Sequence, residues 1–143
     1  MLEIGDELAI RDLNARYIDA VNRVDGEAWQ ATWAEDARWN IFGTEFRGRA
    51  AIFEVWKGAM AQFDFVVMAL NSGTLAREGN VVRGRWYVTE HLRSRDGSGR
   101  RVLGTYQDEY VRAGGEWRFA KRSYHVIHQG ACDLSGEFRP IPK

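Results

Sequence analysis

The sequence predicts an α+β fold in which helices pack against one side of a strongly curved antiparallel sheet. Two observations favour this class. Between residues 81 and 128, three runs rich in β-branched and aromatic residues are separated by turn residues at 96–99 and 114–115. The first half of the chain shows helical periodicity instead. Since the concave side of a curved sheet must be filled, we expect a pocket between sheet and helices.

The N-terminal half is expected to contain three helices. Residues 5–24 place apolar side chains at three- and four-residue steps, which is typical of an amphipathic helix. Asp25 can cap a short second helix, with Trp29 and Trp33 one turn apart on its inner face. The helical period returns over residues 49–63.

Shorter strands are expected around these helices. Residues 37–42 alternate, and residues 45–47 follow a turn as their partner. Residues 65–76 form a long strand in which the segment 71–73, Asn-Ser-Gly, favours a bulge. The glycines and prolines of residues 129–143 predict an extended C-terminal tail on the surface or on a neighbouring subunit.

The composition is that of one globular domain spanning residues 1–143. Hydrophobic residues make up 45% and charged residues 28% of the chain. Lys+Arg and Asp+Glu each number 20, so no net charge favours nucleic acid or a membrane surface. The sequence lacks a transmembrane run and a signal-peptide layout, and Cys132 is its single cysteine. These features predict a cytoplasmic protein without disulfides.

Alternation along the strands predicts which side chains face the pocket. In the run from residue 81, Trp86, Val88 and Glu90 form the more apolar face and are placed inside. Pairing across the 96–99 turn is expected to bring Glu90 near Tyr106 and Val88 near Asp108. The inner face of the second run then comprises Gly104, Tyr106, Asp108 and Tyr110.

The last run leaves two registers open, because a slip of one residue exchanges the two faces. A two-residue turn at 114–115 would point one set inward: Phe119, Lys121, Ser123 and His125. A turn with a glycine bulge would point the other set inward: Arg122, Tyr124, Val126 and His128. Without a bulge between them, His125 and His128 lie on opposite faces, so no metal site is predicted.

Three segments resemble the SnoaL-like branch of the nuclear transport factor 2 superfamily. They are RYIDAVNRVDGEAW, ATWAEDARWNIFGTEFRG and GTYQDEYVRAGGEWRFAKR, at residues 16–29, 31–48 and 104–122. The resemblance extends to the scytalone dehydratases, bile acid 7α-dehydratases and hexachlorocyclohexane dehydrochlorinases of this branch. It implies a cone-shaped α+β barrel, a homotrimer or homodimer, and elimination chemistry on hydrophobic rings without metal or organic cofactor. It also favours the bulged register, with Arg122 and Tyr124 inward.

The catalytic residues of these relatives are not all matched. In them, an Asp on the first helix orients a His on the long strand, and that His is the general base. The resemblance places these two positions at Asn22 and Val67, so both halves of the dyad are missing here. Tyr17 matches the tyrosine of the first helix, and Glu90 matches a pocket carboxylate. Another group must therefore carry any proton transfer.

Glu90 is the predicted general base, since an apolar pocket disfavours the charged carboxylate and raises its pKa. Its alternative role is a salt bridge to Arg122. Tyr17, Tyr106 and Asn22 are the predicted polar helpers, although buried tyrosines are as often purely structural. Asp108 and Arg122 are expected either to orient the substrate or to form a structural ion pair. The predicted substrate-binding residues are Trp39, Val67, Trp86, Val88, Asp108, Arg122, Tyr124 and His128.

Together these features predict a cofactor-independent lyase of the dehydratase type. Its substrate is expected to be a hydrophobic, aromatic or polycyclic small molecule. Two alternatives stay open: an isomerase or cyclase with a single carboxylate base, and a non-catalytic small-molecule-binding protein. Besides the small molecule, the expected partner is a second copy of the chain, with no nucleic acid and no membrane.

Overall fold

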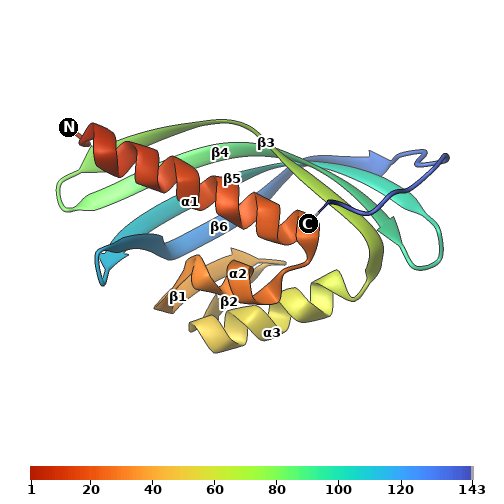
Figure 1. The fold of residues 1–143 in the computed structure, drawn as a ribbon, viewed down its shortest axis with the longest axis horizontal. Coiled ribbons are helices and arrows are strands. Elements are labelled where there is room, and N and C mark those ends of the chain that lie inside the picture. The colour runs from red at the N-terminus through yellow and green to blue at the C-terminus, as the bar shows by residue number, and fades with distance from the viewer. Residues whose placement is uncertain (143) are drawn as a thin grey trace.

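A computed structural model describes residues 1–142, and they form three helices and one six-stranded sheet (Figure 1). The long helix α1 crosses one face of the sheet, and α2 and α3 lie beside its C-terminal half (Figure 1). The elements are α1 (Ile4–Arg23), α2 (Gly26–Ala31), β1 (Trp33–Ile41), β2 (Thr44–Arg47), α3 (Arg49–Met60), β3 (Phe63–Glu78), β4 (Val81–Ser94), β5 (Gly99–Ala113) and β6 (Glu116–Ala131).

The sheet is curved, open and mixed. Its strands are ordered β2-β1-β6-β5-β4-β3, so β2 and β3 are free edges. Neighbouring strands are antiparallel except β1 and β6, which are parallel. The predicted α+β class is confirmed, with a strongly curved sheet wrapped around the N-terminal helices. The sheet is not purely antiparallel, because the last strand, β6, lies parallel to β1, which comes from the first half of the chain.

The N-terminal helices begin and end as their sequences favour. Helix α1 has acidic residues in its first turn and Arg23 in its last, and it ends where Val24 adopts the left-handed conformation. Asp25 caps α2 as predicted, because its carboxylate accepts the backbone N–H of Ala28 at 3.1 Å. Helix α2 ends at Ala31, so Trp33 opens β1 and does not continue the helix, contrary to the prediction.

The register of the meander differs from the prediction, but its faces do not. Glu90 pairs with Val102 and Val88 pairs with Gly104, each four residues from the predicted partner. The reason is that β5 already begins at Gly99, which pairs with Arg93, so the turn lies earlier in the chain than the predicted 96–99 turn. A shift by an even number preserves the alternation, so the predicted inner face of β5 is confirmed.

Two bulges decide the faces of β6. The chain turns through Gly114-Gly115, and β6 first points Phe119 inward. An irregularity between the pairs of Glu109 and Tyr110 then leaves Ala120 unpaired, so Arg122 and Tyr124 also point inward. A second bulge, at Ile127, shifts the register again. His128 therefore lies exposed on the outer face, and its predicted inward position is wrong.

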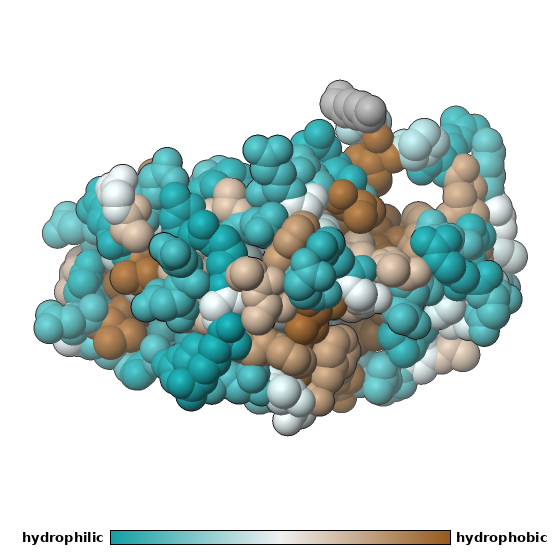
Figure 2. All heavy atoms as spheres, turned by 90° about the horizontal axis from the view of Figure 1, so that it is seen from below, coloured by the Kyte–Doolittle hydropathy of each residue, from teal (hydrophilic) through white to brown (hydrophobic). Residues whose placement is uncertain are grey.

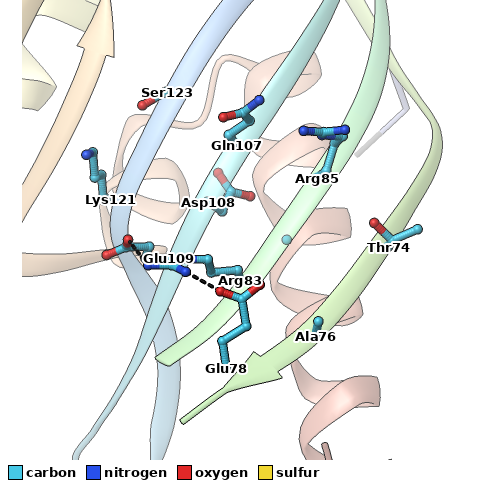
Figure 3. Close-up of a pocket in the computed structure, with 11 residues that line it drawn as sticks. Thr74, Ala76, Glu78, Arg83, Arg85, Gln107, Asp108, Glu109, Lys121 and Ser123 are labelled. Atoms are coloured by element: carbon cyan, nitrogen blue, oxygen red, sulfur yellow. Dashed lines mark hydrogen bonds and ion pairs between the residues drawn. The ribbon is translucent and has the colours of Figure 1, made fainter. Parts of the chain in front are cut away.

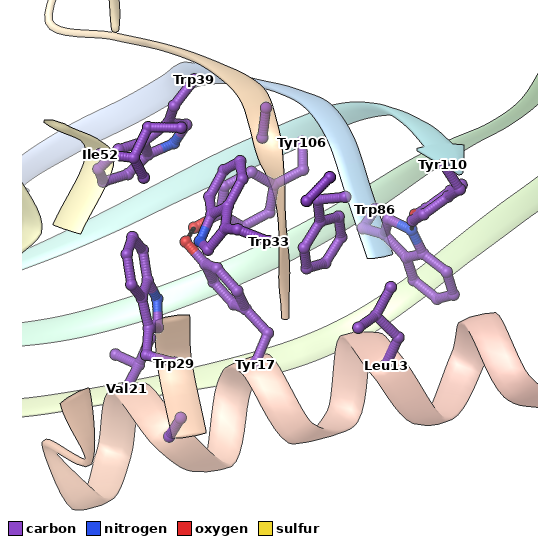
Figure 4. Close-up of a cluster of buried hydrophobic side chains, with 14 of the residues drawn as sticks. Leu13, Tyr17, Val21, Trp29, Trp33, Trp39, Ile52, Trp86, Tyr106 and Tyr110 are labelled. Atoms are coloured by element: carbon purple, nitrogen blue, oxygen red, sulfur yellow. Dashed lines mark hydrogen bonds between the residues drawn. The ribbon is translucent and has the colours of Figure 1, made fainter. Parts of the chain in front are cut away.

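The core between α1 and the sheet is dominated by tryptophans (Figure 4). Trp29 stacks on Trp56, with ring centroids 4.7 Å apart and planes at 13°. Trp33 and Trp39 pack against the same group at 5.5–5.7 Å. Further along the sheet, Trp86 donates its indole N–H to Tyr110 at 2.7 Å. This packing fills the middle of the concave side and leaves space towards one end.

The C-terminal tail folds back onto its own chain. β6 extends to Ala131, so the tail begins later than the predicted residue 129. Phe138 packs edge-on against Phe65 at 4.7 Å, and the guanidinium of Arg93 lies 3.8 Å from its ring centroid. Lys143, the last residue of the predicted tail, lies outside the described residues. Over residues 1–142, no helix has the length and hydropathy to span a membrane.

Candidate functional site

A cavity of about 380 Å³ lies at one end of the concave face, and we call it the central cavity. Tyr17 and Val21 reach it from α1, Trp39 from β1 and Trp56 from α3, while β3 to β6 supply the remaining wall. Its lining is mostly apolar, as small-molecule sites usually are. Seen from the side of α3 and β2, apolar side chains also gather in the middle of the surface, bordered by polar ones (Figure 2).

Glu90 is the one carboxylate among the described residues that line the central cavity. Its Oε1 accepts a hydrogen bond from the hydroxyl of Tyr124 at 2.8 Å. Burial raises the pKa of Glu90 above its ordinary value, and the Tyr124 hydrogen bond and the Arg100 charge oppose this rise. Within residues 1–142 Glu90 forms no ion pair. The alternative prediction of a salt bridge between Glu90 and Arg122 is wrong, because Arg122 binds Asp108.

Three tyrosines line the same cavity as this carboxylate. The hydroxyl oxygens of Tyr17 and Tyr106 lie 3.4 Å apart, and the rings of Tyr106 and Tyr124 pack at 4.9 Å. Burial raises the pKa of all three hydroxyls, so they stay protonated near neutral pH. A protonated hydroxyl can donate a hydrogen bond to a substrate oxygen or to a departing group. These residues occupy the cavity positions that the sequence predicts.

Asp108 and Arg122 form a buried ion pair below the cavity. Nε and Nη2 of Arg122 each donate to the carboxylate at 2.8 Å. Arg122 also donates to Asn14 at 2.5 Å, and Tyr110 donates to Asp108 at 2.6 Å. Neither member of the pair lines the central cavity, so their predicted contact with substrate is wrong and their alternative role as a structural pair is supported.

Asn22 is occupied by the backbone of β3. Its side-chain oxygen accepts the N–H of Met68 at 2.7 Å, and its amide nitrogen donates to the Met68 carbonyl at 3.0 Å. Val67 lies beside Asn22 in a groove at the free edge of β3, while Val66 and Met68 line the cavity. Asn22 and Val67 therefore do not line the central cavity itself, although their groove shares Trp56, Met60, Phe63 and Val66 with it. Alternate side chains of β3, namely Val66 and Met68, face the cavity, whereas the side chain of Val67 points to the opposite face of the sheet.

Three further predictions on the wall have mixed outcomes. Trp39 lines the central cavity as expected. Trp86 and Val88 are buried on the same face as Glu90 but lie too far along β4 to reach the cavity. Alternation identifies the face of a strand and gives no position along it, which explains this error.

The bulge at Ile127 also changes the prediction for the histidines. It places both His125 and His128 on the outer face, where they pair with Thr105 and Leu103. Across residues 1–142, however, no three His, Cys, Asp or Glu side chains gather closely enough to hold a metal ion.

The sequence interpretation missed several lining residues. Val66 and Met68 could have been found from alternation once Val67 was placed outside. Arg100 and Gln129 depend on the register of β5 and β6 and have no local signal. Phe42 does have a local sequence signal, since a phenylalanine before Gly43 at the tip of a hairpin is unusual for a solvent-exposed turn.

A second depression, of about 330 Å³, lies on the opposite face of the sheet (Figure 3). Thr74, Arg85 and Gln107 project from neighbouring strands there, with α1 behind the sheet (Figure 3). Arg83 pairs with both Glu78 and Glu109 in this depression. The depression is polar and open, and its acids are paired with arginines, Glu78 and Glu109 with Arg83 and Asp108 with Arg122, so the central cavity is the better candidate site.

Comparison with known proteins gives a family and several structural neighbours. The family described as "SnoaL-like domain" matches residues 2–123. A hexachlorocyclohexane dehydrochlorinase (LinA) type 2 is similar with a TM-score of 0.86 at 18% identity, covering 96% of this chain and 95% of that one. Comparison with curated proteins gives no match.

Two solved structures from Novosphingobium aromaticivorans are also similar. One is a proposed aromatic ring hydroxylase, with a TM-score of 0.84 and 27% identity over 92% of this chain and 96% of that one. The other is a proposed scytalone dehydratase, with a TM-score of 0.82 and 17% identity over 98% of this chain and 95% of that one. At these identities the dehydrochlorinase and the dehydratase establish the shared fold.

Proposed function

The chain belongs to the SnoaL-like domain family, and from this membership and the central cavity we propose that it is a lyase-type enzyme. Its substrate is a hydrophobic ring compound, and the reaction removes a proton and a small leaving group without a cofactor. A dehydrochlorinase and a proposed dehydratase share the fold, which supports an elimination. The cavity is apolar and large enough for such a ring.

The observation that carries this proposal is the environment of Glu90. The carboxylate is buried in an apolar cavity, has no cation bound to it among residues 1–142, and has a raised pKa. A carboxylate with a raised pKa is a stronger base than one in water. It therefore replaces the imidazole that the dyad positions, Asn22 and Val67, do not supply.

In the proposed reaction, Glu90 takes a proton from a ring carbon. The electrons of that C–H bond form a carbon–carbon double bond, and the bond to the leaving group on the neighbouring carbon breaks. Tyr17 and Tyr106 donate hydrogen bonds to the leaving group or to a developing oxyanion. Tyr124 holds the Glu90 carboxylate by its hydrogen bond. The proton on Glu90 then returns to water or to the departing group.

An isomerase is the second candidate, and the presence of one carboxylate in the cavity favours it. A single base can remove a proton from one carbon and return it to another with no leaving group. The mass of the product distinguishes the two, because isomerisation leaves the mass of the substrate unchanged and elimination lowers it.

The test begins with a thermal-shift comparison of phenolic alcohols, chlorinated rings, sterols and polyketide-like aromatics. Each compound that stabilises the protein is incubated with it and its products are measured by mass spectrometry. For a converted compound, Glu90→Gln is expected to lower kcat by about 10²–10⁴-fold, with binding little changed. The matched control is Glu27→Gln, which removes an exposed carboxylate on α2. An unchanged kcat in Glu90→Gln would remove this residue from the mechanism.

A further inference from the structure

The central cavity opens into a second hollow on the surface, which we call the outer pocket. It has a volume of about 440 Å³ and lies between α3, the β1–β2 hairpin and the start of β5. Phe42, Ala59, Phe63 and Arg100 line both spaces, so the two are continuous. A ligand in contact with Glu90 can therefore extend through this mouth into the outer pocket.

Arg100 is a positive charge at the mouth, and Glu90, whose pKa this charge lowers, is the one acid among the described residues that lines the same cavity. Arg100 lies on β5 two residues before Val102, the partner of Glu90, and its guanidinium is 6.0 Å from the centroid of Phe63. Over residues 1–142 it makes no ion pair and no side-chain hydrogen bond, whereas Arg93 nearby binds Asp64 at 2.7 Å. No acidic side chain of the described residues lines the outer pocket, where Gln62 and Ser94 are the other polar side chains.

Phe42 gives the mouth a strained aromatic lip. Its side chain is 72% exposed, and its φ of +56° is followed by a φ of +73° at Gly43. These angles are those of a two-residue hairpin turn in which Asn-Gly is preferred and a bulky aromatic residue is unfavourable. Strain of this kind is typical of binding sites, where the side chain has a use that compensates for it. Here its ring is available to contact a flat ligand in the mouth.

We propose that the substrate is a ring carboxylate. Its apolar ring occupies the central cavity between Glu90 and Phe42, and its carboxylate projects into the outer pocket to pair with Arg100. The same charge offsets the repulsion between the substrate carboxylate and Glu90. This inference rests on the proposed function, since it assigns the substrate class of the same cavity.

The test compares two ligands of equal shape, 2-naphthoate and 2-naphthamide, by isothermal titration calorimetry at low salt. The naphthoate is expected to bind about fivefold more tightly, which is the size of an ion pair at a partly exposed site. Arg100→Gln should make the two affinities equal. Arg101→Gln is the matched control: it removes the neighbouring charge on the opposite face of β5, outside both pockets, and should keep the preference. High salt should reduce the preference for naphthoate over naphthamide.

Equal affinities in the unmodified protein, or no binding of either ligand, would overturn the inference. A preference for naphthoate that persists in Arg100→Gln would also overturn it. If this variant then changed only the pH profile of kcat/KM, the role of Arg100 would be to set the pKa of Glu90. Because binding needs no turnover, a naphthoate preference without any conversion of ring compounds would contradict the proposed lyase and leave the ring carboxylate as a ligand of the cavity. Conversion of neutral ring compounds without a preference for naphthoate would support the proposed lyase and contradict the inference.

Phe42→Asn distinguishes a role of the Phe42 ring in ligand binding from a role in folding. Asparagine suits the turn, so the midpoint of urea unfolding should rise. Loss of the ring should nevertheless weaken both naphthalene ligands alike, by about threefold or more. A variant that is more stable and binds less well cannot be explained by misfolding. Undiminished binding of both ligands would exclude Phe42 from the site.

Discussion

At the scale of single residues, the chemistry of the cavity depends on how Glu90 is surrounded. Burial raises its pKa from the ordinary 4.5, and the hydrogen bond from Tyr124 and the charge of Arg100 lower it again. Because the folded-state pKa is raised, the protonated carboxyl contributes stability at low pH. This contribution is lost as the pH rises through the folded-state pKa. The residue therefore gains basicity at the expense of stability near neutral pH.

Tyr124→Phe tests this balance. The hydrogen bond stabilises the ionised carboxylate, so its removal should raise the pKa of Glu90 further. In the proposed reaction Glu90 acts as a base when ionised, so the acidic limb of the kcat/KM profile should move to higher pH. The control is Tyr87→Phe on the outer face of β4, 42% exposed, which should leave the profile in place. A Tyr124→Phe profile that coincides with that of the unmodified enzyme would contradict this role.

At the scale of elements, Asn22 acts as a substitute for a missing strand. β3 is a free edge of the sheet, and the Asn22 side chain satisfies both backbone groups of Met68 on that edge. It thereby fixes the end of α1 to the strand that faces Glu90, since Met68 and Glu90 pair across β3 and β4. Unpaired edges invite association with other strands, and this contact covers part of one.

Asn22→Asp should therefore destabilise the fold. The carboxylate can still accept the N–H of Met68, but it cannot donate to the carbonyl, and two acceptors then face each other. We expect a loss of about 1–2 kcal/mol in the free energy of urea unfolding. Asn71→Ala is the control: its amide makes an exposed hydrogen bond to Thr89 at 2.8 Å and should cost less than about 0.5 kcal/mol. Equal stability of Asn22→Asp and the unmodified protein would refute the contact.

The elements with local signals were predictable, and those without were not. Asp25 at the start of α2 and the bulge at Asn71 are confirmed, because a capping residue and an Asn-Ser-Gly segment are local signals. The bulges at Ala120 and Ile127 have no glycine or asparagine. They result from how β6 pairs with β5, so local sequence could not predict that they reverse the faces of the strand.

At the scale of the whole molecule, the pair of Asp108 and Arg122 joins the sheet to α1. Their side chains are 0% and 1% exposed; Tyr110 also donates to Asp108, and Asn14 accepts from Arg122, while Nη1 of Arg122 has no hydrogen-bond partner among the described residues. The guanidinium also lies 3.8 Å from the centroid of Tyr106, which lines the cavity. One buried charge network thus supports β5, β6 and α1 together.

Removal of one partner should be costly. Asp108→Ala leaves a buried guanidinium without its counterion, and we expect a loss of about 3–5 kcal/mol in the free energy of unfolding. The control is Asp12→Ala, which breaks an exposed pair with Arg16 and should cost less than about 1 kcal/mol. Urea unfolding followed by far-UV circular dichroism measures both. A small loss for Asp108→Ala would mean that water solvates the charge.

The candidate site was predictable in its residues more than in its shape. Glu90, Tyr17, Tyr106, Tyr124 and Trp39 follow from alternation and the family resemblance, and all five line the cavity. The errors arise because the cavity occupies one end of the curved sheet, and a strand pattern contains no information on where along the strand a cavity lies. The mouth with its positive charge depends on strand register and on the approach of α3, which are properties of the assembled fold.

The cluster of tryptophans has an optical consequence. The rings of Trp29 and Trp56 are stacked 4.7 Å apart, so their excited states couple and should produce a paired band in the circular dichroism spectrum. Trp56 and Trp39 also line the cavity. A ring that enters will contact two members of this coupled group and alter the emission of the whole cluster. The protein thus contains an intrinsic fluorophore that reports occupancy of its own site, and ligands can be titrated without a label.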